Sequence, residues 1–296
     1  AGTREIPADL ECSGAKPPHK GQDTIHGVTF HQAGASPVRL DDSCDAPMSA
    51  PTPTRADGRG ATELRPFSVD WDPMSFALSS LIVRTGRTAV LCSVSLEEDV
   101  PRWRRGNGCG WLSAEYRLLP GSTPQRQSRE LMKLSGRTQE IQRLIGRSLR
   151  AVLDMDALGE RTLLIDCDVI QADAGTRTAS ITGAWIALRR ACDLLRSQGV
   201  LKQDPIRQQL AAVSVGLIDG TPLLDLDYSE DSRADVDLNV VTAGDGRLLE
   251  LQGTAEQAPF SRSELDAMLN LAESGLQELM QGQRLALATA AGSAIS

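Results

Sequence analysis

The sequence predicts an α+β fold in which helices pack on a mixed, largely antiparallel sheet. Apolar residues recur with a period of two in some segments and of about 3.6 in others, which is typical of strands and helices respectively. Two Asp-Gly pairs, at residues 219–220 and 245–246, each separate two apolar runs, and this pattern predicts two successive hairpins. Helices mixed with hairpins are typical of the α+β class.

The folded part of the 296-residue chain is predicted to begin near Arg55. Residues 1–54 hold seven of the 15 prolines together with many glycine, serine and aspartate residues. Such a composition buries too little apolar surface to offset its chain entropy. We therefore expect a disordered extension over residues 1–54, one folded domain over residues 55–285 and a flexible tail over residues 286–296.

The elements expected within this domain follow from the same periods. Residues 87–96 are apolar and β-branched and predict a buried strand. Apolar residues at helical spacing predict helices over 137–155 and 176–199, with Gly199 ending the second. The remaining elements are a strand over 161–173, hairpins within 210–231 and 234–255, and an amphipathic helix from near Ser263 to about Gln283.

Positive charge is concentrated in residues 101–150, although the whole chain carries a net charge of −8. This segment holds eleven basic and three acidic side chains, a local net charge of +8, and ten of the basic residues are arginine. Arginine matches the geometry of phosphate better than lysine does, so the segregation favours binding to a nucleic-acid backbone. Arg102 and Arg104 are candidates for this contact. The alternative is a solvated basic face that pairs with acidic neighbours or with another subunit.

The segment Gly175-Thr176-Arg177-Thr178 follows a predicted strand and opens a predicted helix. Glycine allows close backbone approach, the first amides of a helix are unpaired, and Arg177 adds positive charge, so one phosphate-sized anion fits there. Ordinary helix capping by either threonine explains the pattern equally well. Arg137 begins the other arginine-bearing helix, and together with Arg177 it suggests a clamp on one anion.

An acidic run lies where the two predicted hairpins meet. Clustered carboxylates repel one another unless cations intervene, and Mg²⁺ prefers oxygen ligands of this kind. A protonated or metal-bound aspartate also assists a phosphate-ester leaving group. Acidic turn residues without a function are the alternative. The residues of this run are Asp225, Asp227, Glu230, Asp231, Asp235 and Asp237.

Histidine and cysteine chemistry is not expected in the folded domain. The three histidines, His19, His26 and His31, all precede it, and the six cysteines form no CxxC pair, so we expect reduced thiols. No apolar run is long enough to cross a bilayer, and the first residues lack the layout of a secretory signal. We therefore expect a cytoplasmic protein.

Long blocks of the chain resemble the ribonuclease PH family of bacterial phosphorolytic 3′→5′ exoribonucleases. The resemblance runs from Arg55 to about Gln283, and blocks of this length and order are more specific than any short motif. They include RADGRGATELRP (55–66), GWLSAEYRLLPGSTPQRQSRE (110–130), GRTQEIQRLIGRSLRA (136–151), LIDCDVIQADAGTRTASITGA (164–184), DYSEDSRADVDLNVV (227–241) and ELQGTAE (250–256).

The resemblance implies a fold similar to domain 2 of ribosomal protein S5 and a hexameric ring built as a trimer of dimers. It implies that inorganic phosphate, as co-substrate, attacks the last phosphodiester of tRNA precursors and other RNA 3′ ends. The products are nucleoside diphosphates, and the reverse reaction adds nucleotides.

Matching positions imply a role for each site residue. The family's phosphate site falls on Arg137, Gly175, Thr176 and Arg177. Its catalytic carboxylates fall on Asp231 and Asp237, which hold Mg²⁺ or assist proton transfer. Its RNA-guiding arginines match Arg126 and Arg129, while Gly121 stands where a third arginine is expected.

Two competing hypotheses follow from the same residues. A non-catalytic RNA-binding ring subunit of an exosome-like assembly shares this fold, but such subunits usually lose the clamp or the carboxylates, and this sequence keeps both. In the second hypothesis the acidic and basic zones only form an interface between subunits. Arg143, Arg147 and Arg150 would then contact another subunit instead of RNA.

Overall fold

The structure, a computed structural model, describes residues 55–131 and 133–293. The expected disordered extension, residues 1–54, lies outside the described residues. The strands are β1 (Phe67–Trp71), β2 (Ser79–Thr85), β3 (Thr88–Glu97), β4 (Trp111–Leu118), β5 (Thr162–Gln171), β6 (Leu210–Ile218), β7 (Thr221–Leu224), β8 (Val236–Ala243) and β9 (Leu248–Ala255). The helices are α1 (Gly136–Ala151), α2 (Met155–Leu158), α3 (Thr176–Ser197), α4 (Tyr228–Asp231) and α5 (Arg262–Ser293).

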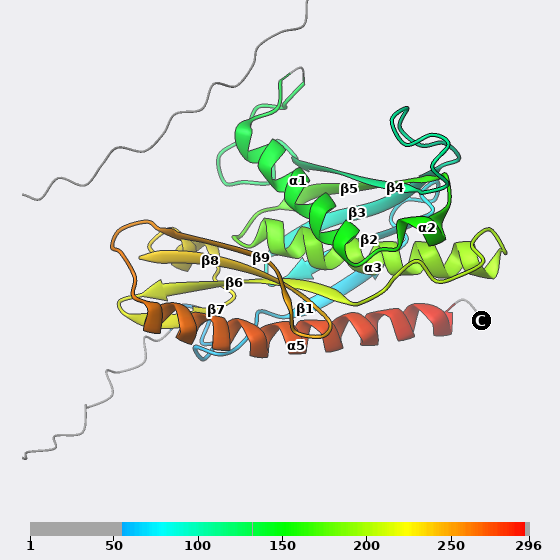
Figure 1. Cartoon of the computed structure of the whole chain (residues 1–296). Helices are drawn as coiled ribbons and strands as arrows, with labels where there is room; N and C mark the ends of the chain where they lie inside the picture. Colours follow the sequence, from blue (N-terminus) through cyan, green and yellow to red (C-terminus); the bar gives the residue numbers. More distant parts are fainter. Residues whose placement is uncertain (1–54, 132, 294–296) are drawn as a thin grey trace, which may run out of the picture. The chain divides into compact units, whose positions relative to one another are not determined.

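The strands form two sheets instead of one. The first has the order β1-β2-β3-β5-β4 and is antiparallel except for the β4–β5 pair, which is parallel. The second has the order β7-β6-β8-β9 and is antiparallel throughout. The predicted α+β class with largely antiparallel pairing is therefore confirmed, and the division into two sheets is the added finding (Figure 1).

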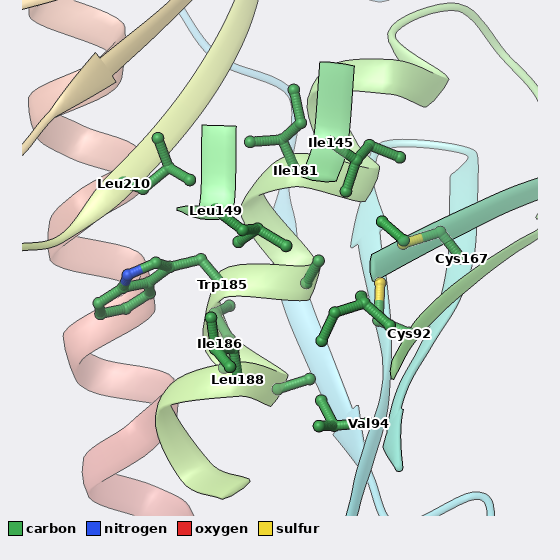
Figure 2. Packing of buried hydrophobic residues seen from close by; sticks show 14 of the residues in the cluster. Cys92, Val94, Ile145, Leu149, Cys167, Ile181, Trp185, Ile186, Leu188 and Leu210 are labelled. Atoms are coloured by element: carbon green, nitrogen blue, oxygen red, sulfur yellow. The ribbon is translucent and has the colours of Figure 1, made fainter. Parts of the chain in front are cut away.

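Helix α3 lies between the two sheets and forms the centre of the core. It contacts β2 and β3 of the first sheet and β6 of the second. Figure 2 shows Cys92 and Cys167 of the first sheet on one side of this helix and the indole of Trp185 on the other, and all three belong to one buried cluster. At Gly183 a Cβ atom would lie 2.5 Å from a methyl carbon of Val83, so only glycine allows this close packing of helix on sheet.

Strand β6 of the second sheet is covered on both faces, because α3 packs on one side of it and α5 on the other. All nine residues of β6 are buried as a result, which is typical of a strand between two layers. Helix α5 also contacts β7 and β8. None of the helices in the described part of the chain is long and apolar enough to span a membrane.

Most predicted elements are confirmed. Helices α1 and α3, strands β3 and β5, and both hairpins with their Asp-Gly turns lie where the sequence places them. The expected end of the last helix near Gln283 is wrong: α5 continues to Ser293, so residues 286–293 are helical where a flexible tail was expected. The four cysteines within the described residues are free thiols, as expected.

Candidate active site

One cavity of about 540 Å³ brings together the residues predicted to bind phosphate and the two predicted catalytic carboxylates. Its wall is formed by the first turns of α1 and α3, by the end of α4, and by facing positions of β8 and β9. These elements are far apart in the sequence and meet at one end of the two sheets (Figure 1). The predicted residues that line the cavity are Arg137, Gly175, Thr176, Arg177, Asp231 and Asp237.

The start of α3 leaves its backbone amides free for an anion. Gly175 is the N-cap residue, adopts a left-handed conformation (φ 63°) and makes no side-chain capping bond. The threonine side chain that competes for this role, Thr178, donates to the Gly175 carbonyl instead of accepting from an amide. The predicted alternative of capping by Thr176 also fails, because its hydroxyl pairs with the buried phenol of Tyr116 at 2.8 Å. The amides of the first turn therefore face the cavity without a side-chain partner.

Both predicted clamp arginines act on the same buried groups. Arg137 lies in the first turn of α1, where Ser135 caps the helix by accepting from the Thr138 amide at 3.1 Å. Burial raises the pKa of Tyr116, and the guanidinium groups of Arg137 and Arg177 oppose that rise. Arg137 and Arg177 both line the cavity, so both positive charges lie at the wall of one space.

Arg177 is held by two further side chains that sequence reasoning missed. Its Nη1 donates to Oε1 of Gln252 on β9 and lies 3.7 Å from Oε1 of Glu140 on α1. Gln252 in turn donates to Glu140 at 3.3 Å. The three side chains form a closed triangle that fixes the guanidinium at the cavity wall.

We expect Gln252→Leu to raise the KM for phosphate about tenfold, the effect of losing one hydrogen bond to a charged group, while kcat at saturating phosphate changes little. Initial rates over a range of phosphate concentrations measure both constants. Glu250→Gln is the matched control. It removes the 2.6 Å ion pair between Glu250 of β9 and Arg147 of α1, and neither residue lines the cavity. An unchanged KM for phosphate in Gln252→Leu would contradict the holding role.

The two carboxylates carry an electrostatic cost in the absence of a cation. Burial raises the pKa of Asp231, and the guanidinium groups of Arg137 and Arg177 partly offset this. Burial raises the pKa of Asp237 as well, and repulsion from Asp231 adds to the rise. Asn239 donates to Oδ2 of Asp237 at 3.1 Å, but Oδ1 is buried and has no hydrogen-bond partner among the described residues.

This pair of carboxylates fits Mg²⁺. The unpartnered Oδ1 of Asp237 and the mutual repulsion of the two groups are the features that a divalent cation relieves. In the described part of the chain, no three metal-binding side chains converge into a complete protein cage. Mg²⁺ typically uses one or two carboxylates and completes its shell with water and substrate phosphate, so two suffice.

Two buried ion pairs, also missed by sequence reasoning, support the cavity wall. Arg55 donates through Nε and Nη2 to both carboxylate oxygens of Glu230, at 2.8 and 2.7 Å, and so anchors α4. Nη2 of Arg65 donates to Oδ1 of Asp225 at 2.7 Å. The same Nη2 lies so close to Gly175 that a Cβ atom at that position would be 2.8 Å from it. Both arginines lie in the block 55–66, which was the only signal that could have found them.

The predicted RNA-binding arginines fall into two groups. Arg126 and Arg129 are exposed in the segment between β4 and α1, and Arg129 lines a smaller cavity together with Thr138, the neighbour of Arg137. Arg102 and Arg104 precede the start of β4, whose eight residues span about 23 Å, and neither lines the cavity. The structure therefore does not bring this second group to the cavity. Gly121 lines a separate cavity and leaves open space at the missing side chain.

Comparisons with known proteins agree with this geometry. Residues 63–192 match the model of the 3′ exoribonuclease family, domain 1, and residues 208–275 match domain 2. The chain is 98% identical over 249 residues to ribonuclease PH of Parasynechococcus marenigrum, covering 84% of this chain and 100% of that protein. It is 74% identical over 240 residues to ribonuclease PH of Prochlorococcus marinus, covering 81% and 98%.

Solved structures with the same fold are more distant. Rice Rrp46 matches with a TM-score of 0.65 at 18% identity, covering 79% of this chain and 100% of that chain. The Archaeoglobus fulgidus exosome with RNA bound to the active site matches with a TM-score of 0.66 at 20% identity, covering 77% and 92%. These likenesses establish the fold, and the sequence matches establish the relationship: the chain belongs to the ribonuclease PH group of the 3′ exoribonuclease family.

Proposed function

We propose that this 3′→5′ exoribonuclease works by phosphorolysis, with orthophosphate bound between Arg137 and the start of α3. The observation that carries the proposal is the shared cavity: two arginines, an uncapped helix N-terminus and two buried carboxylates line one space. A helix N-terminus and guanidinium groups favour a phosphate anion, and the carboxylates supply oxygen ligands for a divalent cation.

In the proposed reaction an oxygen of hydrogen phosphate forms a bond to the terminal phosphorus of the RNA. The bond from that phosphorus to the 3′ oxygen of the preceding nucleotide breaks, and the proton carried by hydrogen phosphate balances the departing oxygen. The products are a nucleoside diphosphate and an RNA shorter by one nucleotide. Arg137, Arg177 and the α3 amides hold the nucleophile in place and offset charge in the transition state.

Asp231 and Asp237 would hold Mg²⁺, which when bound supplies charge neutralisation at the phosphate oxygens. Asn239 orients Asp237 through the bond to Oδ2. The buried hydroxyl of Tyr116 forms a hydrogen bond with the hydroxyl of Thr176 and so holds the first turn of α3 at the cavity wall.

The wider setting of the enzyme is also part of the proposal. We propose tRNA precursors and other RNA 3′ ends as substrates, guided by Arg126 and Arg129, a homohexamer as the assembly, and the cytoplasm as the location. Support comes from the curated relatives named ribonuclease PH and from the ring assemblies among the structural neighbours.

The rival role, a non-catalytic RNA-binding ring subunit, has less support. Such a subunit needs neither an anion clamp nor paired carboxylates. In this chain the four residues of the predicted phosphate site and both carboxylates line the cavity.

A product assay tests the proposed function. Purified protein with Mg²⁺ and phosphate is incubated with a tRNA that carries extra 3′ nucleotides, and the released nucleotides are separated. Phosphate-dependent release of nucleoside diphosphates supports phosphorolysis. Release of monophosphates in phosphate-free buffer would establish hydrolysis, and an intact RNA under both conditions would support the binding role.

A further inference from the structure

The exposed indole of Trp103 is an unusual feature of the segment between β3 and β4. Its side chain is 63% exposed, although it is a large apolar group. It is nevertheless fixed in place, because its ring meets that of Trp111 edge to face, with centroids 4.8 Å apart and planes at 81°. The exposed surface of the indole is therefore presented by a rigid support.

Arginine side chains surround this pair of rings. The guanidinium of Arg104 lies 5.3 Å from the centroid of Trp103 and 5.2 Å from that of Trp111, and Arg150 of α1 lies 4.7 Å from Trp111. Nε of Arg104 is buried and has no hydrogen-bond partner among the described residues. Cation–π contacts hold the two arginines without neutralising their charge.

The local charge balance favours an anionic partner. Arg102, Arg104 and Arg150 form no ion pair with any residue that the structure describes. Of the nearby carboxylates, Asp99 pairs with Arg105, whereas Glu160 and Asp156 keep their negative charge and accept from the Gly108 amide and the Cys109 thiol instead of pairing with Arg102, Arg104 or Arg150. An exposed aromatic face beside unneutralised arginines is the combination that binds unpaired nucleic acid, in which bases stack and phosphates pair.

Helix α1 connects this position to the catalytic cavity. Arg137 at its start lines the cavity and Arg150 near its end lies over Trp111, about 20 Å away at 1.5 Å per residue. Arg143 and Arg147 are exposed between them. Figure 1 shows α1 running along the first sheet, with the segment before β4 at the far end.

We propose that Trp103 is a stacking platform for a base of unpaired RNA, upstream of the 3′ end that occupies the cavity. A stacked strand rises 3.4 Å per nucleotide, so about 20 Å corresponds to about six nucleotides. Arg143 of α1, which is exposed and pairs with no carboxylate among the described residues, would contact an intervening phosphate. This inference rests on the proposed function for the position of the 3′ end, while the stacking itself does not depend on phosphorolysis.

Steady-state kinetics with unpaired RNAs of four and of twelve nucleotides test the proposal. Trp103→Ala should raise the KM for the 12-mer about tenfold, a typical effect of losing one base–aromatic stack, with kcat unchanged. The KM for the 4-mer should not change, because that RNA does not reach the platform. Trp103→Phe should restore most of the affinity. Phe76→Ala is the control, since Phe76 is a fully exposed aromatic on the loop between β1 and β2.

Two further measurements separate the possible failures. Quenching of tryptophan fluorescence by the 12-mer in phosphate-free buffer should be reduced in Trp103→Phe, and this result is independent of the reaction chemistry. Equal KM changes for both RNAs, or none, would overturn the platform. A changed particle mass in Trp103→Ala would overturn it as well, because the indole would then pack against a second copy of the chain. If the 12-mer quenches the fluorescence of the wild-type protein but the protein shows no phosphate-dependent turnover, phosphorolysis is rejected and the stacking platform is not.

Discussion

Replacing Arg177 by alanine should reduce phosphate-dependent shortening of RNA by about two to three orders of magnitude, the usual effect of removing one group that stabilises transition-state charge. The side chain is only 15% exposed, and Gln252 and Glu140 hold it at the cavity wall. Its loss removes a fixed positive charge beside the uncapped start of α3, so both phosphate binding and charge stabilisation are weakened. Arg137→Ala should behave similarly, because Arg137 lines the same cavity.

Initial rates with saturating RNA and varied phosphate measure this effect. Arg196→Ala is the matched control, because Arg196 lies in the last turn of the same helix and pairs with Asp193 and Asp204 away from the cavity. RNA binding by Arg177→Ala should remain close to that of the wild type. Full turnover of either cavity variant would show that the anion site has been assigned to the wrong residues.

Replacing Arg55 by methionine should lower the free energy of unfolding by about 3–5 kcal/mol, the usual effect of breaking a buried ion pair from one side. The carboxylate of Glu230 is 1% exposed and would remain buried, and among the described residues Arg59, at 3.7 Å, would be its one remaining ion-pair partner. Glu230 also accepts from the Asp227 amide in the capping box of α4. We therefore expect α4 to shift and to carry Asp231 out of position.

Thermal unfolding and activity together test this second prediction. A loss of this size should lower Tm by about 10 °C in a chain of this length, and activity should fall below the level explained by unfolding. Arg105→Met is the control: it breaks an exposed pair with Asp99, and water and salt screen such pairs so that they contribute little to stability. A Tm close to that of the wild type in Arg55→Met would refute the anchoring role.

The sequence predicted the elements whose pattern is strong. Helix α3 was found because its apolar stripe is long, and the hairpins because each has an Asp-Gly pair, in which Asp219, Gly220 and Gly246 adopt a positive φ. Strand β4 was missed although its buried Leu112, Ala114 and Tyr116 alternate with polar residues in the period of two that is typical of a half-buried strand. The division into two sheets was missed because strand pairing is a tertiary property that periodicity does not encode.

The site was predicted in part for a similar reason. Arg137 and Arg177 line one cavity, as expected from their positions at helix starts, and their binding of phosphate stays a prediction. Gln252 and Glu140 were missed because their role arises only from contact between α1, α3 and β9. Counting charge grouped Arg102 and Arg104 with the cavity arginines, whereas the length of β4 separates them.

The central claim is that orthophosphate held in the cavity becomes part of the released nucleotide. Incubating the wild-type protein with Mg²⁺, unlabelled 3′-extended RNA and radiolabelled orthophosphate, and then separating the nucleotides, follows this transfer directly. We predict that the label enters nucleoside diphosphates in proportion to the nucleotides removed, and that Arg177→Ala transfers almost none. Shortened RNA accompanied by unlabelled nucleotides would contradict the account.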